Sequence, residues 1–519
     1  MRRRRSILGL SAAAAALAVL ACARADVQAP ATQRPSQITL APATDPATLA
    51  PSAAAFTPTA SSSPTPDQPE PVLSPTLPPT PTLPAEAEPE SIVYASQPGD
   101  TLRALAIRFG VLPADITSSS PLPVSADSLI DPDQLLVLPR RLGPTGPSER
   151  LIPDSEVVDS PHAADFDGSG VAAELDGYLN RYQEYLGNRW YDGADVIELA
   201  GRDNSFNPRL LMALLEYLSN WVTDPTRPTG DAWRYPLGRI DPQIPGLYRQ
   251  LTWLSNALGE GYYGWRSGTL TELTFRDGSI VRLAPDLNAG TVAIQYLLAQ
   301  YSSGREWAEA LAPDGFVATY RKLFGDPWSF VHPLYEPGLA QPPMILPFLP
   351  GHVWAFSGGP HGAWEKDAAW AALDFSPPSV ETGCAASSDW VVAASAGLVV
   401  RSGAGVVVLD LDGDGREQTG WVLLYLHIAT QGRVANGAFL EQGDLIGHPS
   451  CEGGIASGTH VHIARKYNGE WILAAGALPF NLSGWVAEAG SNPYQGALVK
   501  GTQRVLACPC ASQETRISR

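Results

Sequence analysis

The sequence predicts a multidomain protein with three folded parts. These are a small βααβ module, a mainly α-helical middle part and a C-terminal domain built on antiparallel β-strands. The chain has 519 residues, which is enough for several domains of about 150 residues each. Along the chain, apolar residues recur first in a short mixed pattern, then at helical spacing, and finally in short β-branched runs between glycines.

Composition excludes some classes of partner. The chain carries 35 Lys and Arg against 53 Asp and Glu, a formal charge of −18. This acidic balance argues against nucleic acid and against an anionic membrane surface as a partner. With 48 Gly and 48 Pro, the chain is expected to be rich in turns and linkers.

Residues 1–22 are predicted to be a targeting segment. Four arginines precede a short apolar run from Ile7 to Ala21, shorter than the ~20 residues that span a bilayer, so the segment is read as an export signal. It ends in Val19-Leu20-Ala21-Cys22, which resembles a bacterial lipobox. The resemblance implies a lipid on Cys22 that tethers an exported, extracytoplasmic protein to the outer face of a membrane. Ordinary cleavage, with Cys22 incidental, is the alternative.

Residues 23–90 consist mainly of Pro, Ala, Thr and Ser. Such a segment cannot bury enough apolar surface to fold, so we expect an extended, disordered linker.

Residues 91–140 are predicted to form the βααβ module. Val93-Tyr94 begins a strand, Leu102 to Phe109 shows helical spacing, Leu112 opens a second helix, and Leu135 to Leu138 closes with a strand. The segment resembles a LysM module through Tyr94-x-x-Gln97-Pro98-Gly99-Asp100-Thr101-Leu102, Arg108-Phe109-Gly110-Val111 and Pro132-x-Gln134-x-Leu136-x-Leu138-Pro139. The resemblance implies binding of N-acetylglucosamine-containing glycans such as peptidoglycan. One departure is that Thr117-Ser118-Ser119-Ser120 stands where the family often carries asparagines.

A polar connector is expected at 141–178 and a helical domain of uncertain role at 179–340. The run Pro208 to Trp221 starts with proline and carries leucines nearly all round, which is typical of a buried helix. Its Glu216 faintly resembles the catalytic glutamate of lysozyme-like glycosidases. The favoured interpretation is a helical spacer in which Glu216 is hydrogen-bonded or exposed, because no second carboxylate stands out.

Residues 345–490 are predicted to be an antiparallel β domain, followed by a tail at 491–519. Its strands are short β-branched runs, as at Gly405 to Asp410 and Trp421 to His427. Asp410-Leu411-Asp412-Gly413-Asp414-Gly415 looks like the start of a calcium loop, but position twelve is Trp421 instead of glutamate. A polar hairpin is therefore preferred.

Two histidines in one predicted strand, His460 and His462, are the most informative pair. Strand side chains alternate, so both face the same way, roughly 6–7 Å apart. Upstream stand His361, in a glycine-rich turn, and Asp374, flanked by apolar residues. A catalytic zinc takes three ligands from His, Asp, Glu or Cys and keeps an open position for water, and His361, Asp374 and His462 supply such a set. His460 and His427 then suit a general base and a stabiliser of the tetrahedral intermediate.

The domain resembles the M23 family of zinc metallopeptidases, the lysostaphin-like or LasA-like peptidoglycan endopeptidases. The resemblance implies a fold of the duplicated-hybrid-motif type, one Zn²⁺ per domain held by His361, Asp374 and His462, and catalytic roles for His427 and His460. Glu365 and Asp367 are rival third ligands. The matching motifs are Gly358-Gly359-Pro360-His361, Leu373-Asp374-Phe375, Tyr425-Leu426-His427, Gln442-Gly443-Asp444-Leu445-Ile446-Gly447 and Ser457-Gly458-Thr459-His460-Val461-His462.

Four cysteines follow Cys22. In an exported protein an even count favours disulfides, and Cys384 with Cys451 is the expected pair. For Cys508 and Cys510, a strained pairing, ligand binding and the reduced state all remain open.

The expected function is a surface-anchored zinc endopeptidase that cuts peptide bonds in peptidoglycan and is held on the wall by the LysM-like module. Two alternatives stay open: a non-catalytic wall-binding or activator protein, and a dual hydrolase in which the helical domain cuts glycan around Glu216.

Overall fold

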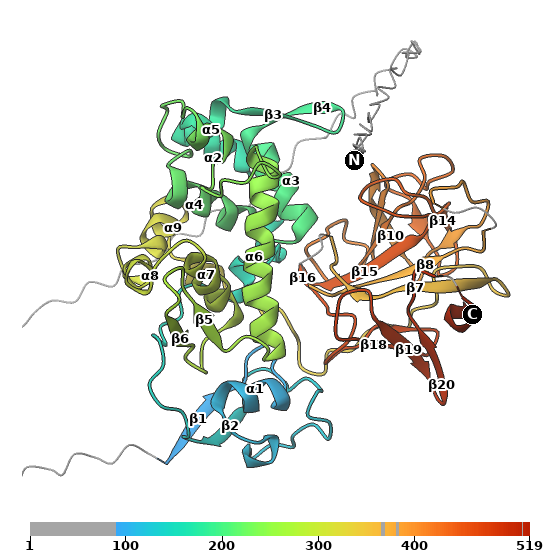
Figure 1. The fold of residues 1–519 in the computed structure, drawn as a ribbon, viewed down its shortest axis with the longest axis horizontal. Coiled ribbons are helices and arrows are strands. Elements are labelled where there is room, and N and C mark those ends of the chain that lie inside the picture. The colour runs from blue at the N-terminus through green and yellow to red at the C-terminus, as the bar shows by residue number, and fades with distance from the viewer. Residues whose placement is uncertain (1–89, 365–368, 380–382, 511) are drawn as a thin grey trace, which may run out of the picture. The chain divides into compact units, whose positions relative to one another are not determined.

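A computed structural model describes residues 90–364, 369–379, 383–510 and 512–519 (Figure 1). The expected export signal, Cys22, the linker, Glu365 and Asp367 lie outside the described residues. Among the helices of the described ranges, none is both long enough and apolar enough to cross a membrane.

The N-terminal module, residues 91–140, pairs two strands around one helix. Strand β1 (Ser91–Ala95) lies antiparallel to β2 (Leu135–Pro139), and between them stand α1 (Leu102–Phe109) and a 3₁₀ turn, η1 (Pro113–Asp115). The Thr101 side chain caps α1 by accepting a hydrogen bond from the amide of Ala104. The prediction of a second helix in the βααβ order is wrong, because only the 3₁₀ turn η1 forms at that place. Serines and prolines follow it, and these residues compete with or break helical hydrogen bonding.

The middle part contains helices and two short hairpins. Its longest helix, α6, has 21 residues and is drawn in green in Figure 1. The elements are α2 (Gly168–Leu175), α3 (Gly193–Asn204), α4 (Pro208–Ser219), α5 (Asp231–Arg234), α6 (Leu247–Ser267), α7 (Ala289–Ala299), α8 (Gly304–Leu311), α9 (Phe316–Phe324), the hairpins β3 (Gln183–Leu186) with β4 (Arg189–Asp192) and β5 (Glu272–Thr274) with β6 (Ile280–Arg282), and the 3₁₀ turns η2 (Asp154–Glu156), η3 (Pro161–Ala163), η4 (Tyr178–Arg181) and η5 (Pro327–Phe330).

The expected polar connector takes part in the helical core. Leu151, Ile152, Val157 and Val158 are buried together with the apolar residues of α3, α4, α6 and α7. Residues 150–178 thus contribute to the middle part rather than merely leading to it.

The C-terminal part is built on a nine-stranded antiparallel sheet. Its strand order is β13-β10-β11-β12-β15-β8-β7-β21, and the short strand β16 pairs with β15. A four-stranded sheet, β17-β18-β19-β20, and the pair β9-β14 complete the part. The strands are β7 (Val353–His361), β8 (Ala372–Ser376), β9 (Val391–Val392), β10 (Gly397–Gly403), β11 (Val406–Asp410), β12 (Trp421–Leu426), β13 (Phe439–Leu440), β14 (Leu445–Gly447), β15 (Val461–Tyr467), β16 (Glu470–Trp471), β17 (Asn481–Leu482), β18 (Trp485–Ala489), β19 (Gly496–Lys500), β20 (Gln503–Leu506) and β21 (Arg516–Ser518), with a 3₁₀ turn, η6 (Gln513–Thr515), before the last.

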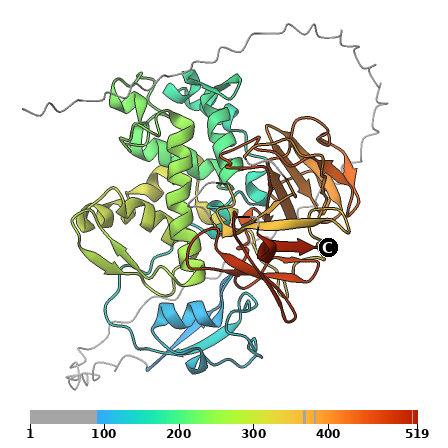
Figure 2. The ribbon, with the colours of Figure 1, turned by 45° about the vertical axis from the view of Figure 1, so that its right-hand side comes forward.

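The expected tail, residues 491–519, supplies three of these strands. The last of them, β21, pairs with β7 and lies along the edge of the large sheet beside the C-terminus (Figure 2). The tail therefore completes the sheet that carries the candidate site.

The two faces of the large sheet belong to two different cores. Val407, Leu423 and Ile463 face one core, which is internal to the β part. Their strand neighbours Val408, Leu424 and Ala464 are buried in the same core as the helical part, as are Val406, Val422 and Ala372. Because side chains alternate along a strand, this second face is also the one that Asp374 and His462 share.

Candidate metal centre

Four neighbouring strands bring the predicted site residues to one end of the large sheet. His361 ends β7, Asp374 lies in β8, and His462 follows the first residue of β15. Asp374 and His462 stand directly opposite each other across the β8–β15 pair. His427 comes directly after β12, whose last residue faces His462.

Three ligand-type atoms converge there. His361 Nε2 lies 3.0 Å from His462 Nδ1, and Asp374 Oδ1 lies 3.3 Å from each of these nitrogens. Ligands bound about 2.0–2.1 Å from a tetrahedral zinc stand about 3.3 Å apart, so the three separations fit one ion. Asp374 Oδ1 is also buried without a hydrogen-bond partner, which a metal ion would supply.

The second nitrogen of each histidine fixes its ligand atom. His361 Nδ1 is 2.8 Å from the carbonyl oxygen of Gly359, and His462 Nε2 is 2.9 Å from that of Ala363. A carbonyl oxygen only accepts, so these nitrogens carry the protons and leave His361 Nε2 and His462 Nδ1 free for a metal.

The pKa values of the three residues depend on one another and on burial. Burial by itself would raise the pKa of Asp374, but His361 and His462 bring that pKa well below its usual value. Burial opposes protonation of His361, yet the Asp374 carboxylate raises its pKa. Burial lowers the pKa of His462. Asp374 is thus held ionised, as a metal ligand must be, and a bound metal would displace the proton that the raised pKa favours on His361.

Gly358 makes room for the aspartate, because a Cβ at this position would lie 2.4 Å from Asp374 Oδ2. We expect Gly358→Ala to displace the carboxylate and to weaken metal affinity by about 10–100-fold, as loss of a ligand's support does elsewhere. Metal titration by calorimetry measures this, with Gly403→Ala as the control, since a Cβ there meets nothing within 4 Å. Equal affinities for the two variants would contradict this role of Gly358.

His460 and His427 stand beside the three ligands. Their ring centroids are 4.4 Å apart, and His460 Nε2 lies 3.8 Å from Asp374 Oδ1. His460 Nδ1 is 2.7 Å from the Gly458 carbonyl oxygen, and His427 Nδ1 is 2.8 Å from that of Glu452. Each ring therefore keeps its proton on Nδ1 and offers Nε2 for proton transfer. Burial lowers the pKa of His427 to about 4, and its φ of 66° is unusual for a residue other than glycine.

Sequence reasoning missed Tyr494. Its ring stacks on His361 with centroids 4.1 Å apart, and it is 45% exposed. Burial raises the pKa of Tyr494, and the nearby Asp374 carboxylate adds to the effect. No spacing signal could have found it, since Tyr494 lies in the segment expected to be a tail.

The Glu216 carboxylate is held in place by hydrogen bonds from the chain that follows its helix. The carboxylate accepts hydrogen bonds from the amides of Val222 and Thr223 and from the Thr223 hydroxyl. These bonds hold the chain that follows α4, so Glu216 is hydrogen-bonded, which is one of the two arrangements expected for it.

The segment from Asp410 to Gly415, which looked like the start of a calcium loop, leads into the loop of the β11–β12 hairpin. Asp410, Asp412 and Asp414 bring carboxylate oxygens close together, but the Asp410 carboxylate already accepts hydrogen bonds from the amides of Asp412, Gly413 and Gly415.

Two disulfides are present among the described residues. Cys384 joins Cys451, with Cα atoms 5.7 Å apart, and Cys508 joins Cys510. The first links the segment after β8 to the loop before His460.

Comparisons with known proteins point to one group of proteases. Residues 150–338 match the family model described as LasA, N-terminal domain. Protease LasA of Pseudomonas aeruginosa strain UCBPP-PA14 is 28% identical over 312 residues, covering 55% of this chain and 69% of that protein, and Protease LasA of strain PAO1 matches equally.

A search of solved structures matches part of the chain to an M23 metalloprotease, pseudoalterin, from the deep sea. It is 23% identical, with a TM-score of 0.28, and the match covers 35% of this chain and 100% of that one. The catalytic domain of lysostaphin from Staphylococcus simulans is 20% identical, with a TM-score of 0.17, over 24% of this chain and 89% of that one.

Proposed function

We propose that this protein is an exported zinc metalloendopeptidase that hydrolyses peptide bonds in peptidoglycan. The observation that carries the proposal is the convergence of His361, Asp374 and His462 beside two further histidines with free Nε2 atoms. The sequence similarity to Protease LasA supports a peptidase of the M23 type.

His361, Asp374 and His462 would hold the zinc ion. When bound, zinc lowers the pKa of a water molecule towards about 7 and polarises the carbonyl of the bond to be cut. The chain's own residues handle the protons. His460 accepts the proton that water loses as its oxygen bonds to the carbonyl carbon, and this proton then goes to the leaving nitrogen as the C–N bond breaks.

His427 and Tyr494 flank this reaction. The Tyr494 hydroxyl would donate to the carbonyl oxygen as charge develops there. His427, which carries its proton on Nδ1, would accept a hydrogen bond from the attacking water at Nε2. Stacking against His361 also fixes the ring of that ligand.

The remaining parts place the enzyme on its substrate. The N-terminal module is the LysM-like glycan binder, and Cys22 is the lipid anchor, which residues 23–90 join to this module. A disulfide between Cys384 and Cys451 fits an oxidising, extracytoplasmic location.

The products of wall digestion test the proposal. Purified peptidoglycan treated with the protein should give fragments with new amino termini and no new reducing ends, as mass spectrometry and end-group labelling would show. A zinc chelator should stop the reaction, and added zinc should restore it. New reducing ends would indicate glycan cleavage instead, and digestion unaffected by chelation would overturn the metal's role.

A further inference from the structure

The C-terminal end of helix α6 contacts both the N-terminal module and the β part. The last turns of this helix, residues 262–268, supply backbone groups to the first and side chains to the second. The chain thus has a junction at which all three folded parts meet.

Arg108 makes the contact on the side of the N-terminal module. It is 2% exposed, and its guanidinium donates to the Trp265 carbonyl oxygen at 2.7 and 3.1 Å. The same group lies 4.6 Å from the Trp265 ring centroid and 2.7 Å from Asp100 Oδ1. A cation at the carbonyl end of a helix is favoured by the helix dipole, and the Trp265 carbonyl oxygen accepts from Arg108 in addition to the capping amide of Gly268.

Neighbouring contacts extend this interface. Gln97 Nε2 donates to the carbonyl oxygen of Leu287, and Arg282 Nη2 donates to those of Ile107 and Arg108. Gly99 lies directly on the Arg266 side chain, because a Cβ there would be 2.8 Å from Arg266 Nη1. An interface that rests on buried, directional bonds differs from a module on a flexible tether.

Arg266 and Glu470 make the contact on the side of the β part. Arg266 Nη2 lies 3.0 Å from Glu470 Oε2, and both side chains are less than a tenth exposed. Glu470 also accepts from the hydroxyls of Tyr262 and Tyr335, while Arg266 pairs with Asp154. With three donors on its carboxylate, Glu470 has little freedom to move.

Strand β15 connects this contact to the candidate metal centre. Glu470 pairs with Tyr467, the last residue of β15, and His462 stands five residues earlier on the same strand. At about 3.3 Å per residue, the strand spans about 17 Å between them. A paired strand is stiff over this distance, so the junction and the ligand His462 belong to one rigid element.

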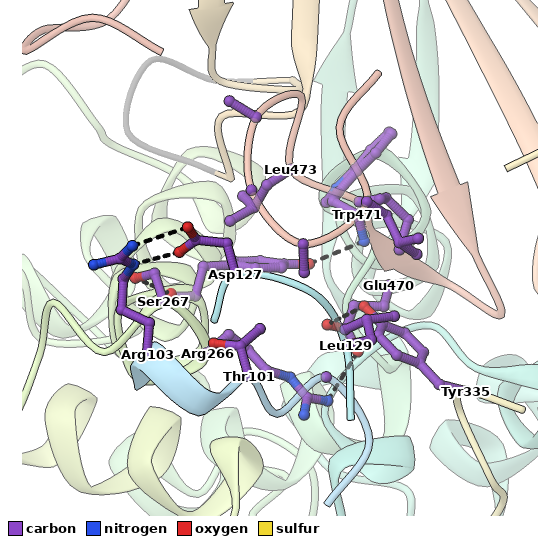
Figure 3. A pocket seen from close by; sticks show the side chains of 17 residues that line it. Thr101, Arg103, Asp127, Leu129, Arg266, Ser267, Tyr335, Glu470, Trp471 and Leu473 are labelled. Atoms are coloured by element: carbon purple, nitrogen blue, oxygen red, sulfur yellow. Dashed lines mark hydrogen bonds and ion pairs between the residues drawn. The ribbon is translucent and has the colours of Figure 1, made fainter. Parts of the chain in front are cut away.

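Figure 3 shows the junction around a cavity of ≈ 160 Å³. Arg103 and Asp127 of the N-terminal module stand on one side, with Arg266 of α6, Tyr335 and Glu470 on the others, and Trp471 and Leu473 continue the wall. Three chain segments far apart in the sequence therefore line one space.

We infer that the junction holds the N-terminal module at a fixed distance and orientation from the metal centre, and that Arg108 is the positioning residue. The inference rests on the proposed function for its substrate. The module then does more than raise the local concentration of peptidoglycan around the metal centre. Its fixed position determines which peptides reach the metal, according to where they lie relative to the glycan that the module binds.

The first test measures distance and needs no activity. Spin labels on noncanonical residues at Val124 and Phe439, both exposed, report the separation of the module and the β part. We expect one narrow distance distribution in the full chain, a broad one in Arg108→Ala, and an unchanged one in the control Arg141→Ala, whose ion pair with Asp115 is at the surface. A broad distribution in the unaltered chain, or a narrow one in Arg108→Ala, would overturn the inference.

The second test separates positioning from binding and from folding. With Arg108→Ala, kcat on insoluble peptidoglycan should fall by about tenfold, while wall binding and cleavage of a short soluble peptide stay unchanged. Arg108→Lys keeps a cation beside Asp100, so its kcat on peptidoglycan should lie between those of the unaltered chain and Arg108→Ala. Arg282→Ala should weaken the interface without altering the interior of the module. Equal losses on both substrates would mean a structural role only. If the unaltered chain cuts neither substrate, the proposed function fails, and the distance measurement still decides the inference.

Discussion

His460→Ala is expected to lose turnover while keeping its metal, whereas His462→Ala loses both. In the proposed site His462 would offer Nδ1 to the ion together with His361 and Asp374, so its removal would leave two ligands where a catalytic zinc needs three. His460 lies beside this set with its Nε2 free, 3.8 Å from Asp374 Oδ1. Loss of a general base costs about 10²–10⁴-fold in rate, and this cost should appear in kcat.

Metal content and rate are measured on the same preparations. Elemental analysis should give one zinc per chain for the unaltered protein and for His460→Ala, and much less for His462→Ala. His448→Ala is the control, since His448 packs against the Trp390 ring and contacts the Asp389 carbonyl oxygen instead of the candidate ligands. Loss of zinc from His460→Ala would assign that residue to the ligand set and refute the division of roles.

Of the substitutions described, Arg401→Ala is expected to lower the free energy of unfolding most. Arg401, in β10, lies 2.7 Å from Asp203 of α3 and 2.7 Å from Glu417 of the β11–β12 loop, and all three side chains are mostly buried. Removing the cation leaves two buried carboxylates without their main partner. Breaking a buried ion pair in this way costs about 3–5 kcal/mol. Urea unfolding at pH 8 measures the free energy of unfolding.

The loss should shrink in acid. In the unaltered chain, burial alone would raise the pKa of Glu417, but Arg401 and Lys466 hold it below its usual value. Without Arg401, burial prevails and the folded-state pKa of Glu417 rises above the unfolded value of about 4.3. A group with a raised folded pKa stabilises the protein below the unfolded pKa and loses this contribution as the pH rises through the folded pKa. Asp203, whose pKa burial already raises, acts in the same sense.

A surface pair provides the comparison. Arg305 and Glu309 form an ion pair along α8 with side chains 89% and 62% exposed. Arg305→Ala should change the free energy of unfolding by less than about 0.5 kcal/mol. If Arg401→Ala lowers the free energy of unfolding as little as Arg305→Ala does, the buried ion pairs of Arg401 do not hold the helical and β parts together.

The sequence could predict those features that depend on local pattern. The helix beginning at Pro208 follows from its first proline and its leucines, and the strands ending at Asp410 and Leu426 follow from β-branched runs. The convergence of His361, Asp374 and His462 could be predicted only through the family resemblance, because spacing along the chain does not say which strands become neighbours.

Other features depend on tertiary context. The expected second helix after Leu112 reduces to a 3₁₀ turn, and the expected connector contributes Val157 and Val158 to the helical core. Tyr494 reaches the candidate site because β18 and β19 bring the intervening loop beside His361. Arg108 looks like an ordinary surface charge in the sequence, since nothing local reveals that the end of α6 covers it.

The pairing of β21 with β7 has a consequence for how the protein avoids self-association. Strand β7 carries His361, and Trp354 and Ala355 of β7 pair with Ile517 and Arg516. Without these last residues, β7 would be an open sheet edge able to pair with a strand from another molecule. Strand β21 thus covers the edge beside the candidate metal ligands, and a truncation that removes it would leave β7 open to pairing with other molecules.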